Sequence, residues 1–192
     1  SALGTGTDGE GVFALATYAD NVFVGGEFYS ASNVTMFNIG QWNGTNWSAL
    51  GSGLMGRVIS LAVSGTDLYA GGWFTISNGT APAGVAKWDG TRWSVLGLGM
   101  NGWIYALAVM GTNLYAGGDF TQAKNPDGST VGSTGGCRWD GSKWRSWGPG
   151  FYIYSLTANG TNLYVGGDGP TVRRWNGASW SSLGSGFNSR VF

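Results

Sequence analysis

The chain has 192 residues, of which 42% are hydrophobic, so it is long enough for one ordinary globular domain. Charged residues make up only 10%, and ten Lys and Arg balance ten Asp and Glu, which argues against a basic face for nucleic acid. Histidine is absent and Cys137 is the single cysteine, which excludes a Ser-His-Asp triad, imidazole metal ligands and an internal disulfide.

The dipeptide Gly-Gly recurs behind an apolar run in each quarter of the chain. The first glycines of these pairs are 46, 46 and 49 residues apart, at Gly25, Gly71, Gly117 and Gly166. Each period also holds two tryptophans around a tight polar turn, in the pairs Trp42 and Trp47, Trp88 and Trp93, Trp139 and Trp144, and Trp175 and Trp180. A fixed period of this length predicts an array of structural repeats.

Within each repeat, runs of β-forming residues alternate with turn signals and predict four strands. The expected strands are, in chain order, 11–19, 22–28, 37–42 and 47–50; 57–63, 68–74, a strand ending in 85–88, and 93–96; 104–109, 114–120, 136–139 and 144–147; 153–157, 163–167, 172–175 and 180–183. No segment has a convincing helical period. Four short antiparallel strands per repeat predict an all-β fold, a β-propeller of four-stranded blades.

The predicted organisation is a single propeller or propeller segment over residues 1–192. Its repeats span about 1–47, 48–93, 94–144 and 145–180, and residues 181–192 start a further repeat. The first residues match the fourth-strand motif and the last match the start of an inner strand. This overlap favours a piece of a longer propeller-containing chain over a closed four-blade ring, although unpaired edges joined between copies are an alternative.

The Gly-Gly pair followed by two aromatics around a turn resembles the kelch-type blade, with Trp where kelch repeats usually have Tyr at the first aromatic. The fuller pattern, as in residues 88–97 and 114–121, is similar to tandem repeats of large secreted and cell-surface proteins, including the fungal cell-polarity marker group. The resemblance covers nearly the whole chain and implies the propeller fold. Its implication for function is weak, because propellers serve many roles.

The residue after each Gly-Gly is acidic in three repeats, as Glu27, Asp119 and Asp168, and is Trp73 in the second. Such carboxylates could hold Ca²⁺ or sugar hydroxyls. With one per blade rather than a cluster, we favour the alternative that each accepts backbone N–H bonds from a neighbouring loop, and no metal or cofactor is expected. The turn residues Asp89 and Asp140 alternate with Asn in the other repeats, which indicates turn geometry rather than a needed charge.

Aromatics outside the repeat pattern are better candidates for a ligand or partner surface than the recurring Trp pairs, which we expect to pack between blades. They are Trp73, Trp103, Phe151, Tyr152 and Phe187, with Tyr29 as a further candidate. An insertion at 122–135 in the third repeat is either a recognition loop or a tolerated surface insertion.

The composition, rich in Gly and aromatics and poor in Lys and Glu, is typical of secreted β proteins. Five Asn-x-Ser/Thr sequences are candidate glycosylation sites, at Asn33, Asn43, Asn46, Asn78 and Asn159. Three of them are Asn-Gly-Thr sequences that turn geometry also explains.

These features predict a non-enzymatic extracellular or cell-surface protein that builds a matrix, layer or filament through contacts with other protein chains or copies of itself. Membrane insertion is not expected, because no apolar stretch is long enough to span a bilayer. The alternative is a carbohydrate-binding propeller with sites between blades, and a hydrolase is a distant third.

Overall fold

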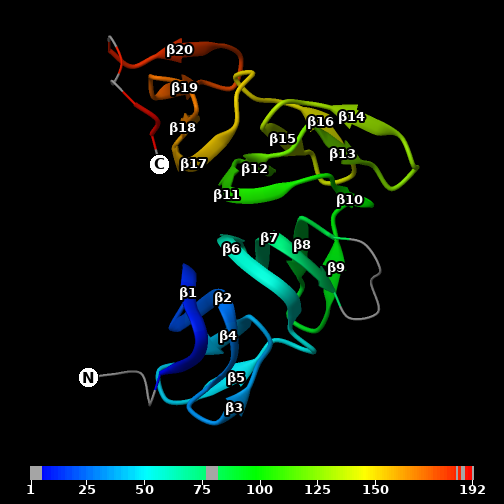
Figure 1. Cartoon of the computed structure of the whole chain (residues 1–192), viewed down its shortest axis with the longest axis vertical. Coiled ribbons are helices and arrows are strands. Elements are labelled where there is room, and N and C mark those ends of the chain that lie inside the picture. Colours follow the sequence, from blue (N-terminus) through cyan, green and yellow to red (C-terminus); the bar gives the residue numbers. More distant parts are fainter. Residues whose placement is uncertain (1–5, 77–81, 185, 187–188, 192) are drawn as a thin grey trace. The chain divides into compact units, whose positions relative to one another are not determined.

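The structure, a computed structural model, describes residues 6–76, 82–184, 186 and 189–191. Every regular element in these residues is a β-strand (Figure 1), which confirms the predicted all-β class. The chain forms two compact units, Ser1–Val95 and Leu96–Phe192, and each contains two of the repeats. In the described residues no helix has the length and apolar character needed to span a membrane.

The first unit holds two antiparallel sheets whose strands follow one another in chain order. The first sheet contains β1 (Thr7–Tyr18), β2 (Asn21–Ala31), β4 (Ile39–Trp42) and β5 (Trp47–Ala49), with the short β3 (Val34–Thr35) paired to β2. The second contains β6 (Leu54–Ser64), β7 (Asp67–Ile76), β8 (Val85–Trp88) and β9 (Trp93–Val95).

The second unit repeats this arrangement and adds a small sheet. Its two larger sheets contain β11 (Trp103–Met110), β12 (Asn113–Asp119), β15 (Gly136–Trp139) and β16 (Trp144–Ser146), and then β17 (Ile153–Asn159), β18 (Asn162–Gly167), β19 (Arg173–Trp175) and β20 (Trp180–Ser182). The third sheet contains β10 (Gly99–Met100), β13 (Gln122–Lys124) and β14 (Thr130–Gly132).

Each predicted strand overlaps an observed one, but two features differ from the expectation. The first is length: β1 begins at Thr7 and β6 at Leu54, several residues before the predicted starts, because the partner strand continues beyond the Gly-Gly pair and offers hydrogen bonds there. The second is the insertion at 122–135, which forms a hairpin and a fifth sheet with β10 instead of an irregular loop.

The second glycine of each Gly-Gly pair lies beside a bulge in the inner strand. The register between the first two strands shifts in all four repeats, between Val58 and Ser60 in the second for example. A Cβ at Gly72 or Gly118 would lie well within 3.0 Å of the carbonyl oxygen of Arg57 or Trp103. A bulge bends the strand and brings its backbone close, so only glycine fits.

The first glycine of the pair has a different role, because it receives a side chain from the following repeat. A Cβ at Gly25 would lie less than 3.0 Å from the Val58 side chain, and a Cβ at Gly117 would meet Ile153 in the same way. The space beside each of these glycines therefore accommodates a β-branched residue of the following repeat, and this contact is called a seat below. Neighbouring blades within a unit approach closely at this point.

The Trp pairs face each other across the turn between the third and fourth strands. Their ring centroids lie 5.3 to 5.5 Å apart in the four repeats. In each turn the Asp or Asn Oδ1 accepts two backbone N–H groups, as Asp89 does from Thr91 and Arg92. Asp and Asn make the same two bonds, which supports the prediction that turn geometry rather than charge selects them.

The core of each unit lies between its two larger sheets. In the first unit Ile39 of one sheet packs with Val58 and Leu68 of the other, and in the second unit Tyr115 packs with Ile153 and Leu163. Indole N–H groups add long-range hydrogen bonds within each unit: Trp93 Nε1 donates to the Leu50 carbonyl at 2.9 Å, and Trp144 Nε1 to the Leu96 carbonyl at 2.8 Å. Trp93 also packs on the core between the two sheets of the first unit, in line with the expected packing between blades.

Candidate functional site

The acidic residue after the first Gly-Gly pair is held by an arginine of the next repeat. Glu27 Oε2 forms an ion pair with Arg57 Nε, and Arg57 Nη2 also lies 2.8 Å from Glu10 Oε2. Arg57 directly precedes Val58, the residue seated on Gly25. The blade-to-blade contact of the first unit thus has an apolar part and, beside it, a charged part.

The fourth repeat builds the same pair of contacts with Asp168. Its Oδ1 lies 2.9 Å from Arg190 Nε, and it accepts a hydrogen bond of 2.9 Å from the Tyr154 hydroxyl. Arg190 precedes Val191, and Val191 lies over Gly166 as Val58 lies over Gly25. Glu27 and Asp168 therefore each pair with an arginine side chain, whereas the sequence analysis favoured backbone N–H groups of a loop as their partners.

Asp119 occupies the same position in the third repeat, and its surroundings differ. Tyr152 stands where the other two repeats have arginine, since it directly precedes Ile153, the residue seated on Gly117. Asp119 is exposed, and within the described part of the chain its carboxylate has no ion pair or side-chain hydrogen bond. This carboxylate is available to a molecule from outside.

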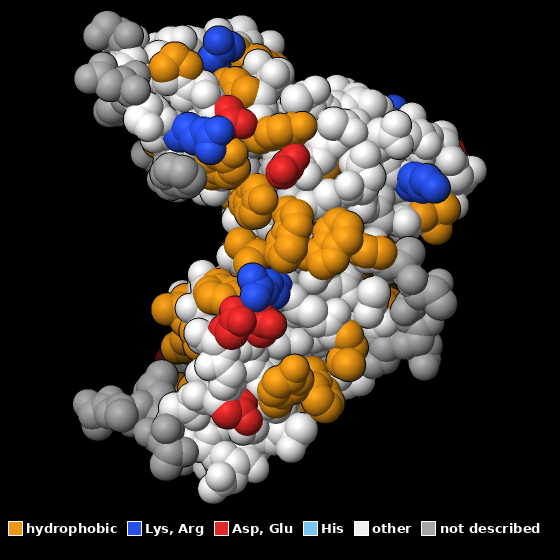
Figure 2. All heavy atoms as spheres, viewed as in Figure 1, with side chains coloured by type: hydrophobic (Ala, Val, Ile, Leu, Met, Phe, Trp, Pro, Cys, Tyr) orange, Lys and Arg blue, Asp and Glu red, His pale blue; other side chains and the backbone are white. Residues whose placement is uncertain are grey.

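Three aromatic side chains, Trp103, Tyr105 and Tyr154, form an aromatic row beside Asp119. Trp103 faces Asp119 across β11 and β12. The rings of Trp103 and Tyr105 are nearly parallel, with centroids 6.5 Å apart, and Tyr105 lies 5.5 Å from Tyr154. Figure 2 shows hydrophobic and acidic side chains next to each other over β11 and β17.

The electrostatics of the aromatic row follow from this arrangement. Partial burial, together with the negative charge of Asp119, raises the pKa of Tyr105. Burial, and then the hydrogen bond to Asp168, raises the pKa of Tyr154. Both phenols are therefore protonated and neutral near pH 7. The Tyr154 hydroxyl donates to Asp168, and the rings of the row provide π faces beside Asp119.

Sequence reasoning had singled out Trp103 and Asp119 but missed Tyr105 and Tyr154. Each tyrosine directly follows an isoleucine of the inner strand, at the position where the second repeat has Ile59, so the sequence indicated ordinary packing positions. The available signal was this replacement of an aliphatic residue by Tyr in two successive repeats.

The remaining predicted aromatics are placed as follows. Trp73 is 37% exposed and faces Arg57 across β6 and β7, and Tyr29 is exposed near the end of β2. Phe151 packs against the fourth repeat, close to Gly167 and Gly169, with the Arg173 guanidinium 5.9 Å from its ring centroid. Tyr152 is half-buried, and Phe187 lies outside the described residues.

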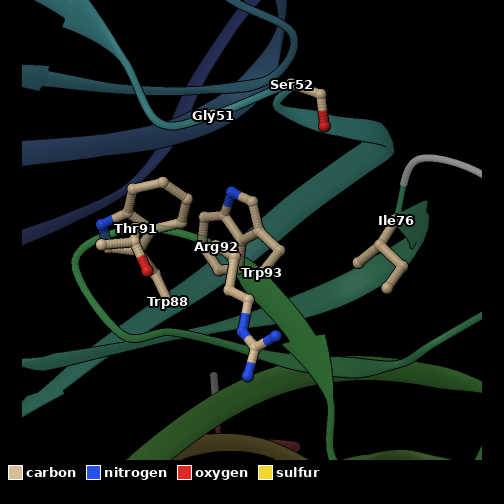
Figure 3. Close-up of a pocket in the computed structure, with 7 residues that line it drawn as sticks. All are labelled: Gly51, Ser52, Ile76, Trp88, Thr91, Arg92 and Trp93. Atoms are coloured by element: carbon tan, nitrogen blue, oxygen red, sulfur yellow. The ribbon is translucent and has the colours of Figure 1, made fainter.

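A separate pocket of about 250 Å³ lies in the first unit, beside the second Trp pair (Figure 3). The indoles of Trp88 and Trp93 form one wall near the Gly51 turn. Its other lining residues are polar or aliphatic: Ser52, Ile76, Thr91 and Arg92. Two indole faces with nearby hydroxyls and a guanidinium can contact both the apolar and the polar side of a small ligand.

The corresponding Trp pair of the third repeat lies against the insertion. Trp144 is only 1% exposed, and its backbone N–H donates to Asn125 Oδ1 at 2.7 Å. Lys143 and Asp127 form an ion pair of 2.6 Å that joins the insertion to the Trp turn. The insertion is thus packed onto its blade.

Four candidate glycosylation sites have exposed side chains, namely Asn33, Asn43, Asn46 and Asn159, and Asn78 lies outside the described residues.

Cys137 is fully buried, and this burial raises the pKa of its thiol to about 12. The thiol is therefore protonated near pH 7, which makes it a poor nucleophile. No three Cys, Asp or Glu side chains of the described ranges come together as metal ligands.

No family model matches the sequence, and no curated protein matches it either. Several solved structures, in contrast, are similar to this chain in fold. The computationally designed propeller Ika8 has a TM-score of 0.60 at 20% identity, and the match covers 99% of this chain and 53% of that one. The designed Ika4 has a TM-score of 0.60 at 19% identity, with 90% and 94% covered.

A chain of the nidogen/laminin complex matches with a TM-score of 0.56 at 16% identity, covering 86% of this chain and 58% of that one. The present chain therefore spans little more than half of the Ika8 and nidogen/laminin chains and nearly all of the Ika4 chain. These similarities, with the antiparallel four-stranded sheets, show that the chain has a β-propeller fold.

Proposed function

We propose that this chain is a non-enzymatic structural or interaction module of a larger extracellular assembly, built from kelch-like blades that follow one another in series. The observation that carries the proposal is the contact by which one blade receives the next. Val58 lies over Gly25, Ile153 over Gly117, and Val191 over Gly166.

The same local contact recurs along the chain, as expected for a protein that builds an array. Each seat needs only a glycine in one repeat and a β-branched residue in the next, so its contribution to stability is added again with every blade. Two of the seats carry an arginine and a carboxylate beside them, in the pairs of Arg57 with Glu27 and of Arg190 with Asp168. The repeated residues of the chain thus serve assembly of the blades, and the positions that differ between repeats remain for recognition.

The extracellular location rests on the composition and on the exposure of Asn33, Asn43, Asn46 and Asn159. In Asn43 the Oδ1 atom is the acceptor of the turn, which leaves the amide nitrogen, the atom that carries a glycan, outside these two bonds. Secretion from a eukaryotic host followed by enzymatic removal of N-glycans and mass spectrometry tests this part. Unmodified Asn at all four positions would argue against it.

The main test is the state of the assembled protein. Electron microscopy of the native particle would count blades per ring and copies per assembly, and sedimentation velocity would follow the mass with concentration. We expect rings joined in series and a mass that grows with concentration. Isolated four-blade discs of constant mass would overturn the proposal.

A matched pair of variants links that result to the seat. Gly166→Val fills the space that Val191 occupies, whereas Gly132→Ala adds a methyl group where no atom lies within 4 Å. We expect the first variant to shift the assembly toward single particles and the second to behave as the parent. Circular dichroism spectra would establish that both variants remain folded.

A second candidate function is carbohydrate binding, favoured by the indole-lined pocket of the first unit. A pyranose ring can stack its apolar face on Trp88 or Trp93 while Ser52, Thr91 and Arg92 contact its hydroxyls. A glycan array tests it, with Trp88→Ala as the disabling variant and Trp139→Ala, the equivalent change in the third repeat, as the control. Glycan binding that survives Trp88→Ala would contradict a site in this pocket.

A further inference from the structure

We propose that Asp119 and the aromatic row of Trp103, Tyr105 and Tyr154 form a docking site for an arginine side chain of a partner protein. This inference rests on the proposed interaction function and names the chemistry of the partner. It is carried by a difference between repeats that are otherwise built alike.

The chain itself shows what the carboxylate at this position binds. After the Gly-Gly pair, Glu27 and Asp168 each form an ion pair with the arginine that precedes the seated β-branched residue of the following repeat. In both cases the guanidinium Nε atom is the nearest donor. The position is therefore a guanidinium acceptor in two of the three repeats in which it is acidic.

In the third repeat the acceptor is present and the internal arginine is missing. Asp119 is acidic, but Tyr152 stands at the position of Arg57 and Arg190. No described cation lies within ion-pair distance of Asp119. A guanidinium supplied by another chain would complete the contact that the other two repeats complete internally.

The aromatic row makes this open position selective. Trp103 lies opposite Asp119, and its ring is nearly parallel to that of Tyr105 at 6.5 Å between centroids. A guanidinium is planar and weakly hydrated, so it can stack on an indole or phenol face while its N–H groups reach the carboxylate. A lysine ammonium lacks the planar face and is more strongly hydrated, so we expect it to bind less well.

A sugar is a weaker occupant of this site than arginine. The carboxylate carries a full charge that a neutral hydroxyl does not balance, and the equivalent positions in this chain hold guanidinium groups. The occupant is therefore an arginine in an exposed segment of a partner protein.

The first experiment uses the full chain labelled with ¹⁵N at tryptophan. The indole N–H signal of Trp103, assigned with Trp103→Phe, is followed during titration with the blocked pentapeptide Gly-Gly-Arg-Gly-Gly. We expect a saturable shift, a weaker one with Lys in place of Arg, and none with citrulline, which keeps the shape and lacks the charge. Equal shifts with arginine and citrulline would overturn the proposal.

Two substitutions localise the binding. Asp119→Asn should weaken the arginine peptide by about tenfold. Asp127→Asn removes a carboxylate of the same unit that is already paired with Lys143 and serves as the matched control. Binding that is unchanged in Asp119→Asn would place the peptide elsewhere and contradict the site.

A third variant restores the internal arginine. Tyr152→Arg reproduces the arrangement of Arg57 beside Glu27, so it should occupy Asp119 and prevent peptide binding. It should also raise the urea midpoint of unfolding, and Asp119→Asn should cancel that gain. A Tyr152→Arg chain that still binds the peptide as the parent does would contradict the equivalence on which the inference depends.

The outcomes separate this inference from the proposed function. If the chain assembles in sedimentation but does not respond to the arginine peptide, the docking site is wrong and the structural role stands. If the peptide binds but the particles are isolated discs of constant mass, the site stands and the assembly proposal is wrong.

Discussion

The second Trp of the second repeat, Trp93, is half-buried beside a pocket, whereas its counterpart in the third repeat, Trp144, is almost fully buried beneath inserted residues. Both indoles donate to a main-chain carbonyl far back in the sequence, Trp93 to Leu50 at 2.9 Å and Trp144 to Leu96 at 2.8 Å. The difference is Asn125, which reaches from the insertion to the Trp144 backbone N–H. A repeated motif thus has one hydrogen-bonding geometry in both units, and the insertion decides how deeply its Trp is buried.

Replacing each of these two indoles by alanine should give clearly different losses of stability. Trp144→Ala should lower the free energy of unfolding by about 4 kcal/mol, because it empties a buried site and removes the bond to Leu96. Trp93→Ala should cost about 2 kcal/mol, since that side chain is already partly in water. Urea unfolding followed by circular dichroism measures both, and equal losses would contradict the comparison.

An alanine at the second glycine of the Gly-Gly pair should lower stability to the same extent in both units. Gly72→Ala and Gly118→Ala each push a methyl group into the backbone of the inner strand and should cost about 3 kcal/mol. The control Gly132→Ala adds its methyl group in open space and should change stability by less than about 0.5 kcal/mol. A tolerated alanine at either Gly-Gly position would show that the bulge is not the reason for glycine.

Loss of the Asn125 side chain should lower the stability of the second unit, through a contact that has no counterpart in the first unit. Asn125→Ala leaves the buried N–H of Trp144 without its acceptor and should cost about 2 kcal/mol. Thr130→Ala, at an exposed position of the same hairpin, is the control. If the two variants unfold at the same urea concentration, the insertion does not stabilise the Trp turn.

The smallest effect concerns pH and the Trp turns. The Thr91 hydroxyl and the backbone N–H groups of the turn hold the pKa of Asp89 below its usual range, and the Arg145 guanidinium, with similar donors, lowers the pKa of Asp140. A carboxyl with a lowered folded-state pKa stabilises the protein above its unfolded pKa near 3.9, and this stabilisation is lost as the pH falls through the folded value.

The variants Asp89→Asn and Asp140→Asn keep the turn acceptor, as Asn43 and Asn176 do, and remove the titrating group. We expect each variant to lose less stability than the parent between pH 5 and pH 2, measured as a smaller shift of the urea midpoint. The change should be larger for Asp140, since Arg145 lies 2.9 Å from it and Arg92 lies 3.6 Å from Asp89. An unchanged pH profile would mean that these turns contribute through geometry alone.

The repeats, the strands of each repeat and the turn chemistry were predictable from the amino-acid sequence. These follow from local rules: the Gly-Gly spacing, the alternation of apolar runs with turn signals, and the short range over which Asp89 or Asn43 accepts turn N–H groups. It also placed Asp119 and Trp103 among the candidate residues.

Which of the equivalent acidic positions form an ion pair and which remain open depends on how the repeats pack together. Glu27 meets Arg57, and Asp168 meets Arg190, only because the following repeat packs its β-branched residue onto a glycine and brings the arginine along. Asp119 lacks that partner because of a single residue, Tyr152. Ion pairing and burial depend on neighbours that are distant in sequence, and local pattern rules carry no information about them.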